Sequence, residues 1–186
     1  MRWRTACLAF FGCFAAAPVW AAAPLTTSVS NSSSPSLGKI VSGSGGTLTT
    51  FTITPAGAVS ASGGNATRLL GTASVTTPTL NITCSGNGSG TNSCTKYSKI
   101  TVTFGSVTSS GGRTGNITAF TGAIATGAAT IATVNSTSFT INPTGGQFSN
   151  GQQVSVKIGM SVQFNNSGSG LGTATALSYA ITYDAS

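Results

Sequence analysis

The sequence predicts an all-β protein, an immunoglobulin-like antiparallel β-sandwich. Apolar residues recur at every second position in several segments, as they do on the buried face of a strand. Short clusters of glycine, asparagine and proline separate these segments, as in turns between short strands. After the leader, no segment has the i, i+3, i+4 apolar spacing of an amphipathic helix. The same periodicity would also fit a closed β-barrel, which stays open as an alternative.

The first element, residues 1–21, is predicted to be a secretory signal peptide. Two arginines give it a positive start, and the apolar stretch 6–19 that follows is too short to span a bilayer. Small residues favour cleavage between Ala21 and Ala22. A lipid anchor on Cys13 is the alternative, which the preceding aromatic residues fit poorly. We therefore expect a mature protein that passes through the periplasm to the cell surface, without stable membrane insertion.

Residues 22–36 form an N-terminal extension before the first core strand. If this segment is extended, Leu25, Thr27 and Val29 share one face. The extension is therefore a candidate strand that could complete the sheet of another molecule.

Residues 37–186 are expected to form one β-sandwich domain, because no linker divides them. Weaker strands are predicted over 37–42, 67–75, 116–120, 129–134 and 138–142. The longest strand is expected to bend or bulge near Gly159. Five strands alternate clearly, and their inward residues are Phe51 and Ile53; Leu80, Ile82 and Cys84; Ile100, Val102 and Phe104; Val154, Val156, Ile158, Met160, Val162 and Phe164; and Leu177, Tyr179, Ile181 and Tyr183.

Cys84 and Cys94 are the two cysteines that remain after processing. An exported chain matures in an oxidising compartment, so we predict that they form a disulfide. Closing this short polar loop should stabilise the fold by about 2.5–3 kcal/mol. Two thiols without a histidine do not supply the ligand set of a transition-metal site.

The mature chain contains a single acidic residue, Asp184, and no histidine or glutamate. General acid–base catalysis needs a titratable group near the working pH, and hard cations need clustered carboxylates. We therefore expect no catalytic residues, no metal site and no cofactor, and we predict that the protein is not an enzyme.

The basic residues of the mature chain are scattered along it, which gives no nucleic-acid footprint. Nucleic acid is therefore not an expected partner, and these residues are interpreted as solubilising surface charges. They are Lys39, Arg68, Lys96, Lys99, Arg113 and Lys157.

The two ends of the mature chain suggest a mode of assembly. Leu25 and Val29 are the apolar anchors of a candidate donor strand. The C-terminal strand could border an unfilled groove that accepts the donor strand of a neighbour by β-augmentation. The residues expected to border this groove are Leu177, Tyr179, Ile181 and Tyr183.

Short motifs at both ends resemble a family of secreted bacterial β-sandwich domains of unknown function. The matching opening is Leu-Gly-Lys-Ile-Val-Ser-Gly-Ser-Gly-Gly-Thr over 37–47, followed by the Thr-Pro-Ala-Gly turn within 53–64. Gly172-Thr173 and Ile181-Thr182-Tyr183 match the family's end. The middle of the chain, 84–148, departs from the pattern and looks like an insertion.

The same class resembles chaperone–usher pilins, which also end in an alternating strand with a tyrosine near the C-terminus. This resemblance implies identical subunits as partners, with a periplasmic chaperone and an outer-membrane usher. It further implies a structural subunit of an extracellular filament or surface layer that assembles by strand donation. The alternative is a monomeric secreted adhesin or a module that binds glycans or another surface, although the mature chain has no tryptophan for a sugar platform.

Overall fold

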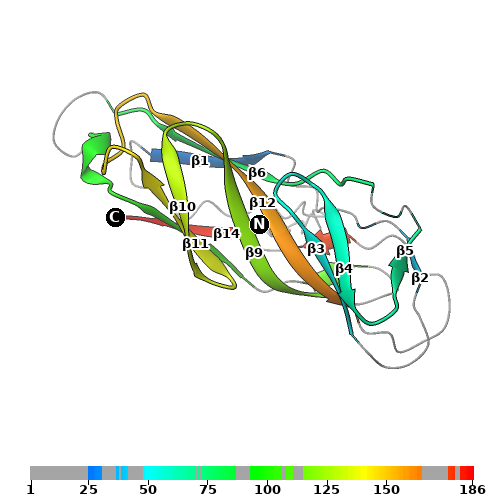
Figure 1. Ribbon diagram of the computed structural model, residues 1–186. Coiled ribbons are helices and arrows are strands. Elements are labelled where there is room, and N and C mark those ends of the chain that lie inside the picture. The colour runs from blue at the N-terminus through cyan, green and yellow to red at the C-terminus, as the bar shows by residue number, and fades with distance from the viewer. Residues whose placement is uncertain are drawn as a thin grey trace, which may run out of the picture.

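The computed structural model describes residues 25–30, 37, 39–41, 48–69, 71, 73–86, 93–105, 108–110, 115–164, 176–178 and 181–186. Within these ranges the chain is an antiparallel all-β protein, as its sequence predicts. A six-stranded sheet and a four-stranded sheet form two layers around a common apolar core (Figure 1).

The six-stranded sheet is organised around its longest strand, β12 (Gln153–Phe164). One edge of β12 pairs along its length with β9 (Gly115–Thr126). The first half of its other edge pairs with β6 (Thr79–Cys84) and the second half with β3 (Thr49–Ile53). The outer strands are β1 (Leu25–Ser30) beside β6, and β4 (Val59–Gly63) beside β3.

The four-stranded sheet has the order β10-β11-β7-β14. Its strands are β7 (Ile100–Phe104), β10 (Ala129–Asn135), β11 (Ser138–Pro143) and β14 (Ile181–Ala185). Three of these four strands come from the middle of the chain, which the family resemblance presents as an insertion. In this chain the middle segment builds most of one layer of the sandwich.

The smaller elements are shorter than the sequence predicts. β2 (Ile40–Val41) pairs with β5 (Thr67–Arg68), although longer strands are expected at 37–42 and 67–75. β8 (Thr108–Ser110) pairs with β13 (Ala176–Ser178), so the predicted final strand is divided between β13 and β14. A short 3-10 helix, η2 (Cys94–Lys96), follows the disulfide loop.

Aromatic side chains from both layers close the core between the sheets. Phe104 of β7 stacks on Phe120 of β9 with ring centroids 3.9 Å apart, and Phe139 of β11 lies tilted 5.6 Å from Phe104. Such contacts add to the free energy of apolar burial. They join the two sheets directly, which establishes the sandwich rather than two independent layers.

Gly159 allows a close approach between strands and is not the site of a bulge. The register of β12 against β9 shifts between Ser155 and Val156 and again between Ser161 and Val162. A Cβ atom on Gly159 would lie 2.5 Å from the Ile53 carbonyl oxygen. The glycine is therefore required by the chain that leaves β3.

Candidate strand-exchange site

Strand β1 forms one edge of the six-stranded sheet, at the very start of the described chain. It pairs antiparallel with β6 in the register Leu25↔Cys84, Thr27↔Ile82 and Val29↔Leu80. Figure 1 shows it as the blue strand beside β6. The candidate donor strand is therefore part of its own sheet in the single chain.

The side chains of β1 alternate as their spacing predicts. Leu25 is 2% exposed and belongs to the common core, and Val29 is half-buried against the same core. Thr26, Ser28 and Ser30 are exposed. Burying a leucine side chain is worth roughly 1.5–3 kcal/mol, so Leu25 is the main apolar anchor of the strand.

Alternate residues of β6 direct their backbone N–H and C=O groups to β1 and to β12. The Cys84 N–H donates to the Gln152 carbonyl at 2.9 Å, and the Cys84 carbonyl accepts from the Gly151 N–H at 2.7 Å. Both groups of Cys84 therefore point away from β1. By the alternation of an antiparallel ladder, the backbone groups of Thr83, Asn81 and Thr79 face β1. The acceptor edge thus combines a polar ladder with apolar contacts at every second residue.

Polar side chains strengthen this edge on its outer face. The Thr26 hydroxyl donates to the Thr83 carbonyl at 3.2 Å. The Asn81 side-chain amide donates to the Ser30 hydroxyl at 3.1 Å and accepts from the Ser155 hydroxyl at 2.8 Å. This network crosses three strands, so Asn81 connects β1 through β6 to β12.

The C-terminal strand β14 contributes to the same core as β1 but does not pair with it. β14 belongs to the other sheet and pairs with β7 in the register Ile181↔Phe104 and Tyr183↔Val102. Ile181 is buried and Tyr183 half-buried, and both pack in the core to which Leu25 also belongs. In the single chain the hydrogen-bonding partner of the donor strand is therefore β6.

The other two residues expected at the groove are placed differently. Leu177 lies in β13, where its backbone pairs with Ser109 of β8. Tyr179 lies outside the described residues.

Tyr183 carries a buried polar group that is unusual for this core. Its hydroxyl is shielded from solvent and has no hydrogen-bond partner among the described residues. Burial raises the pKa of the Tyr183 hydroxyl above its usual value of 10.0. The neutral phenol is thus the form that the fold accommodates.

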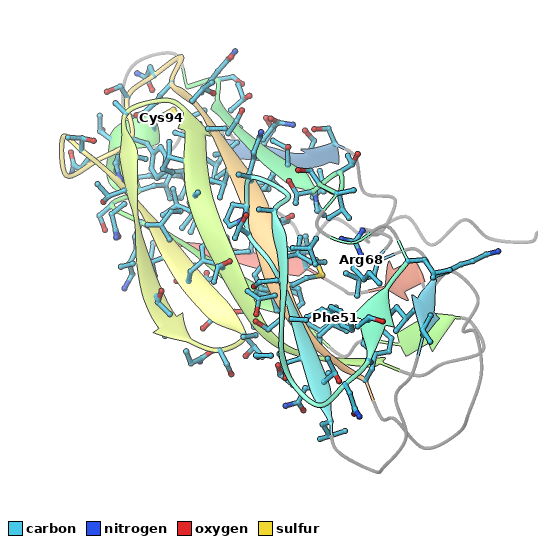
Figure 2. All side chains as sticks on the ribbon, turned by 45° about the vertical axis from the view of Figure 1, so that its right-hand side comes forward. Phe51, Arg68 and Cys94 are labelled. Carbon is cyan, nitrogen blue, oxygen red and sulfur yellow. A yellow bond between two sulfur atoms is a disulfide. The ribbon has the colours of Figure 1, made fainter. Side chains whose placement is uncertain are left out.

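Cys84 and Cys94 form the predicted disulfide, at the end of β6 where Leu25 is seated. The Cys94 N–H donates to the Asn150 side-chain oxygen at 2.9 Å. The Phe148 N–H donates to the Tyr97 carbonyl at 2.9 Å. The disulfide and these bonds join β6, η2 and the turn before β12 into one unit at this end of the sandwich (Figure 2).

Arg68 is buried, which corrects its interpretation as a solubilising charge. It is 7% exposed, and its guanidinium donates to the carbonyl oxygens of Leu37 at 2.7 Å, Ala73 at 2.9 Å and Gly71 at 3.2 Å. Figure 2 shows it away from the Cys94 end of the molecule. Its contacts are with the backbone of surrounding loops, so its role in this fold is structural.

Within the described ranges, no group of three or more histidine, cysteine, aspartate or glutamate side chains could hold a metal ion. In the same part of the chain, no helix is long and apolar enough to cross a membrane. Comparisons with protein-family models, with curated proteins and with solved structures gave no match. The assignment of a function therefore rests on the residues and geometry of the chain itself.

Proposed function

We propose that this protein is a structural subunit of an extracellular filament or surface layer, in which copies exchange strand β1. The observation that carries the proposal is the position of β1. It is a terminal edge strand, paired with β6 on one side, whose inner residues reach the common core. In the assembly, the β1 strand of one copy would occupy the β6 edge of the next.

Exchange of this kind conserves the contacts that hold β1 in the single chain. The same backbone ladder, the same Leu25 burial and the same Asn81 network form between copies. What opposes exchange is the high effective concentration of the chain's own strand, because a tethered strand returns to its own edge in an intramolecular step. Assembly is therefore favoured by crowding of subunits, or by a periplasmic chaperone that keeps β1 away from β6.

The proposed location outside the cell has independent chemical support. The Cys84–Cys94 disulfide persists in oxidising compartments such as the periplasm and the cell exterior. A leader with a positive start and an apolar stretch is typical of export.

A cysteine pair placed across the β1–β6 register tests the proposal. Ser28 and Asn81 are register partners, and Ser28 is exposed. A facing pair of this kind has Cα atoms about 5.5 Å apart, within reach of a disulfide. With Ser28→Cys and Asn81→Cys together, oxidation of assembled material should give a ladder of covalent multimers in non-reducing electrophoresis.

The single variants Ser28→Cys and Asn81→Cys are the matched controls, because one new cysteine per chain can give dimers but no ladder. Cross-linked monomer without multimers, at every protein concentration and in material from the native host, would overturn strand exchange. That result would favour the monomeric adhesin.

A further inference from the structure

The end of the acceptor edge differs from the rest of it, because a disulfide lies opposite the first anchor of β1. Leu25 pairs in register with Cys84, which is bonded to Cys94. All three side chains are buried, with exposures of 2% for Leu25 and 0% for each cysteine.

Leu25 is held at this position by its side chain rather than by its backbone. The N–H and carbonyl groups of Cys84 bond to Gln152 and Gly151, on the β12 side. Leu25 and Cys84 are therefore a non-hydrogen-bonded pair, in which the Cα atoms are about 4.5 Å apart and side chains approach most closely. The shape of the surface around Cys84 consequently decides how well residue 25 is bound.

The surface around Cys84 is held in place by bonds to three segments. The disulfide connects β6 to η2, the Cys94 N–H is bound by Asn150, and the Cys84 backbone is bound to the turn at 151–152. A surface that is bonded to three segments has little freedom to adjust to a larger or smaller side chain at position 25.

The second anchor has a different environment. Val29 pairs in register with Leu80 and is half-buried, so its side chain is not enclosed as that of Leu25 is. The two anchors should therefore differ in how strictly they are recognised.

We propose that the Cys84–Cys94 disulfide is a specificity-determining element for the incoming strand, and that it selects a leucine-sized side chain at the first anchor. The partner that it selects is the β1 segment of a second copy of this chain. This inference deepens the proposed function and rests on it.

The test measures capture of fluorescent synthetic peptides of residues 22–34 by the mature full-length chain, read as fluorescence anisotropy. The chain's own β1 lowers the capture of every peptide by the same factor, so ratios between peptides report the subsites. We expect the parent peptide to be captured at least about tenfold better than its Leu25→Ala version, since an apolar pocket discriminates by this order. In the chain with Cys84→Ala and Cys94→Ala together, this ratio should fall below about threefold.

The Val29→Ala peptide is the matched control, and its ratio to the parent should be the same with and without the disulfide. A general loosening of the fold would lower both ratios. Loss of the fixed surface around Cys84 would lower only the ratio of the parent to the Leu25→Ala peptide. An unchanged Leu25 ratio in the chain without the disulfide would overturn the inference and leave strand exchange standing. Failure of the disulfide-bonded chain to capture the parent peptide would overturn both.

A second measurement needs no cysteine variant, in case the chain without the disulfide does not fold. On the unmodified chain, a Leu25→Phe peptide should be captured about tenfold less than the parent, because the fixed surface around Cys84 leaves no room for the larger ring. A Val29→Phe peptide should be captured within about threefold of the parent. Equal capture of the Leu25→Phe peptide and the parent would overturn the inference.

Discussion

At the scale of single residues, Tyr183 is the clearest departure from a fully satisfied core. Its hydroxyl is buried without a hydrogen-bond partner in the described part of the chain. An unsatisfied buried polar group costs about 1–3 kcal/mol. The ring of Tyr183 therefore stabilises the fold by packing, whereas its hydroxyl oxygen lowers the free energy of unfolding.

Replacing Tyr183 with phenylalanine should remove the cost and keep the packing. We expect Tyr183→Phe to raise the free energy of unfolding by roughly 1 kcal/mol, measured by urea denaturation at pH 7. A loss of stability instead would show that the hydroxyl has a partner.

The same substitution should change the pH dependence of stability. Because the pKa of Tyr183 is higher in the fold than in the unfolded chain, the unfolded chain releases the proton first. The stability that depends on the neutral Tyr183 hydroxyl is fully present below the usual pKa of 10.0 and is lost as the pH rises above it. Between pH 9 and pH 11, the free energy of unfolding should fall more for the unmodified protein than for Tyr183→Phe. An equal fall in the two proteins would contradict a raised pKa for Tyr183.

Arg68 shows what the sequence could not reveal about single residues. Alternation predicts that Leu80, Ile82 and Cys84 point inward, because each lies in a strand of known period. The burial of Arg68 depends on the carbonyl oxygen of Leu37, which is 31 residues away in the sequence, as well as on those of Gly71 and Ala73. No local pattern encodes the contact with Leu37.

The substitution Arg68→Lys should destabilise the protein although it keeps the charge. A lysine cannot reproduce a planar fork that bonds three carbonyl oxygens. We expect a loss of about 2 kcal/mol in unfolding free energy, the usual scale for bonds to a charged group. The exposed Lys157 provides the control, since Lys157→Arg should change stability by less than about 0.5 kcal/mol. Equal effects of the two substitutions would contradict a structural role for Arg68.

At the scale of elements, periodicity predicted the strands that are buried on one face and missed their partners. The inward residues predicted for β12 are all buried, and those of β3, β6 and β7 are buried as well. The pattern could not show that β1 pairs with β6, because β6 presents the same alternation to any neighbour. It also missed β4, whose serines and glycine leave Val59 as its one buried residue.

Gly159 gives an element-scale prediction, because β12 and the chain leaving β3 meet there. A Cβ atom at this position would lie 2.7 Å from the Pro55 nitrogen and 2.5 Å from the Ile53 carbonyl oxygen. Both are backbone atoms, so the strands would have to separate. We expect Gly159→Ala to lower the unfolding free energy by about 1–3 kcal/mol, measured by thermal and urea denaturation. Gly146→Ala is not a suitable control because its φ is +81°, whereas Lys157→Ala, at an exposed position on the same strand, should change stability little.

At the scale of the whole molecule, the uneven charge of the chain bears on how copies meet. The mature chain carries six basic residues and one acidic residue, Asp184, so its side chains give a net positive charge. Copies of such a chain repel one another at low ionic strength. Yet the proposed contact between copies consists of backbone hydrogen bonds and buried apolar side chains, and β1 and β6 carry no charged residue.

Added salt should therefore leave the assembly intact and should speed its formation. At 0.1 M ionic strength the screening length is about 10 Å, and at 1 M it is about 3 Å, so salt removes repulsion without weakening the strand ladder. We expect the covalent ladder of the Ser28→Cys and Asn81→Cys chain to form faster in 1 M sodium chloride than in 0.05 M, with multimers at least as long. Assembly through ion pairs between Asp184 and basic residues would respond in the opposite direction. A ladder that shortens with salt, and that Asp184→Asn also shortens at low salt, would replace strand exchange with a charge-mediated contact.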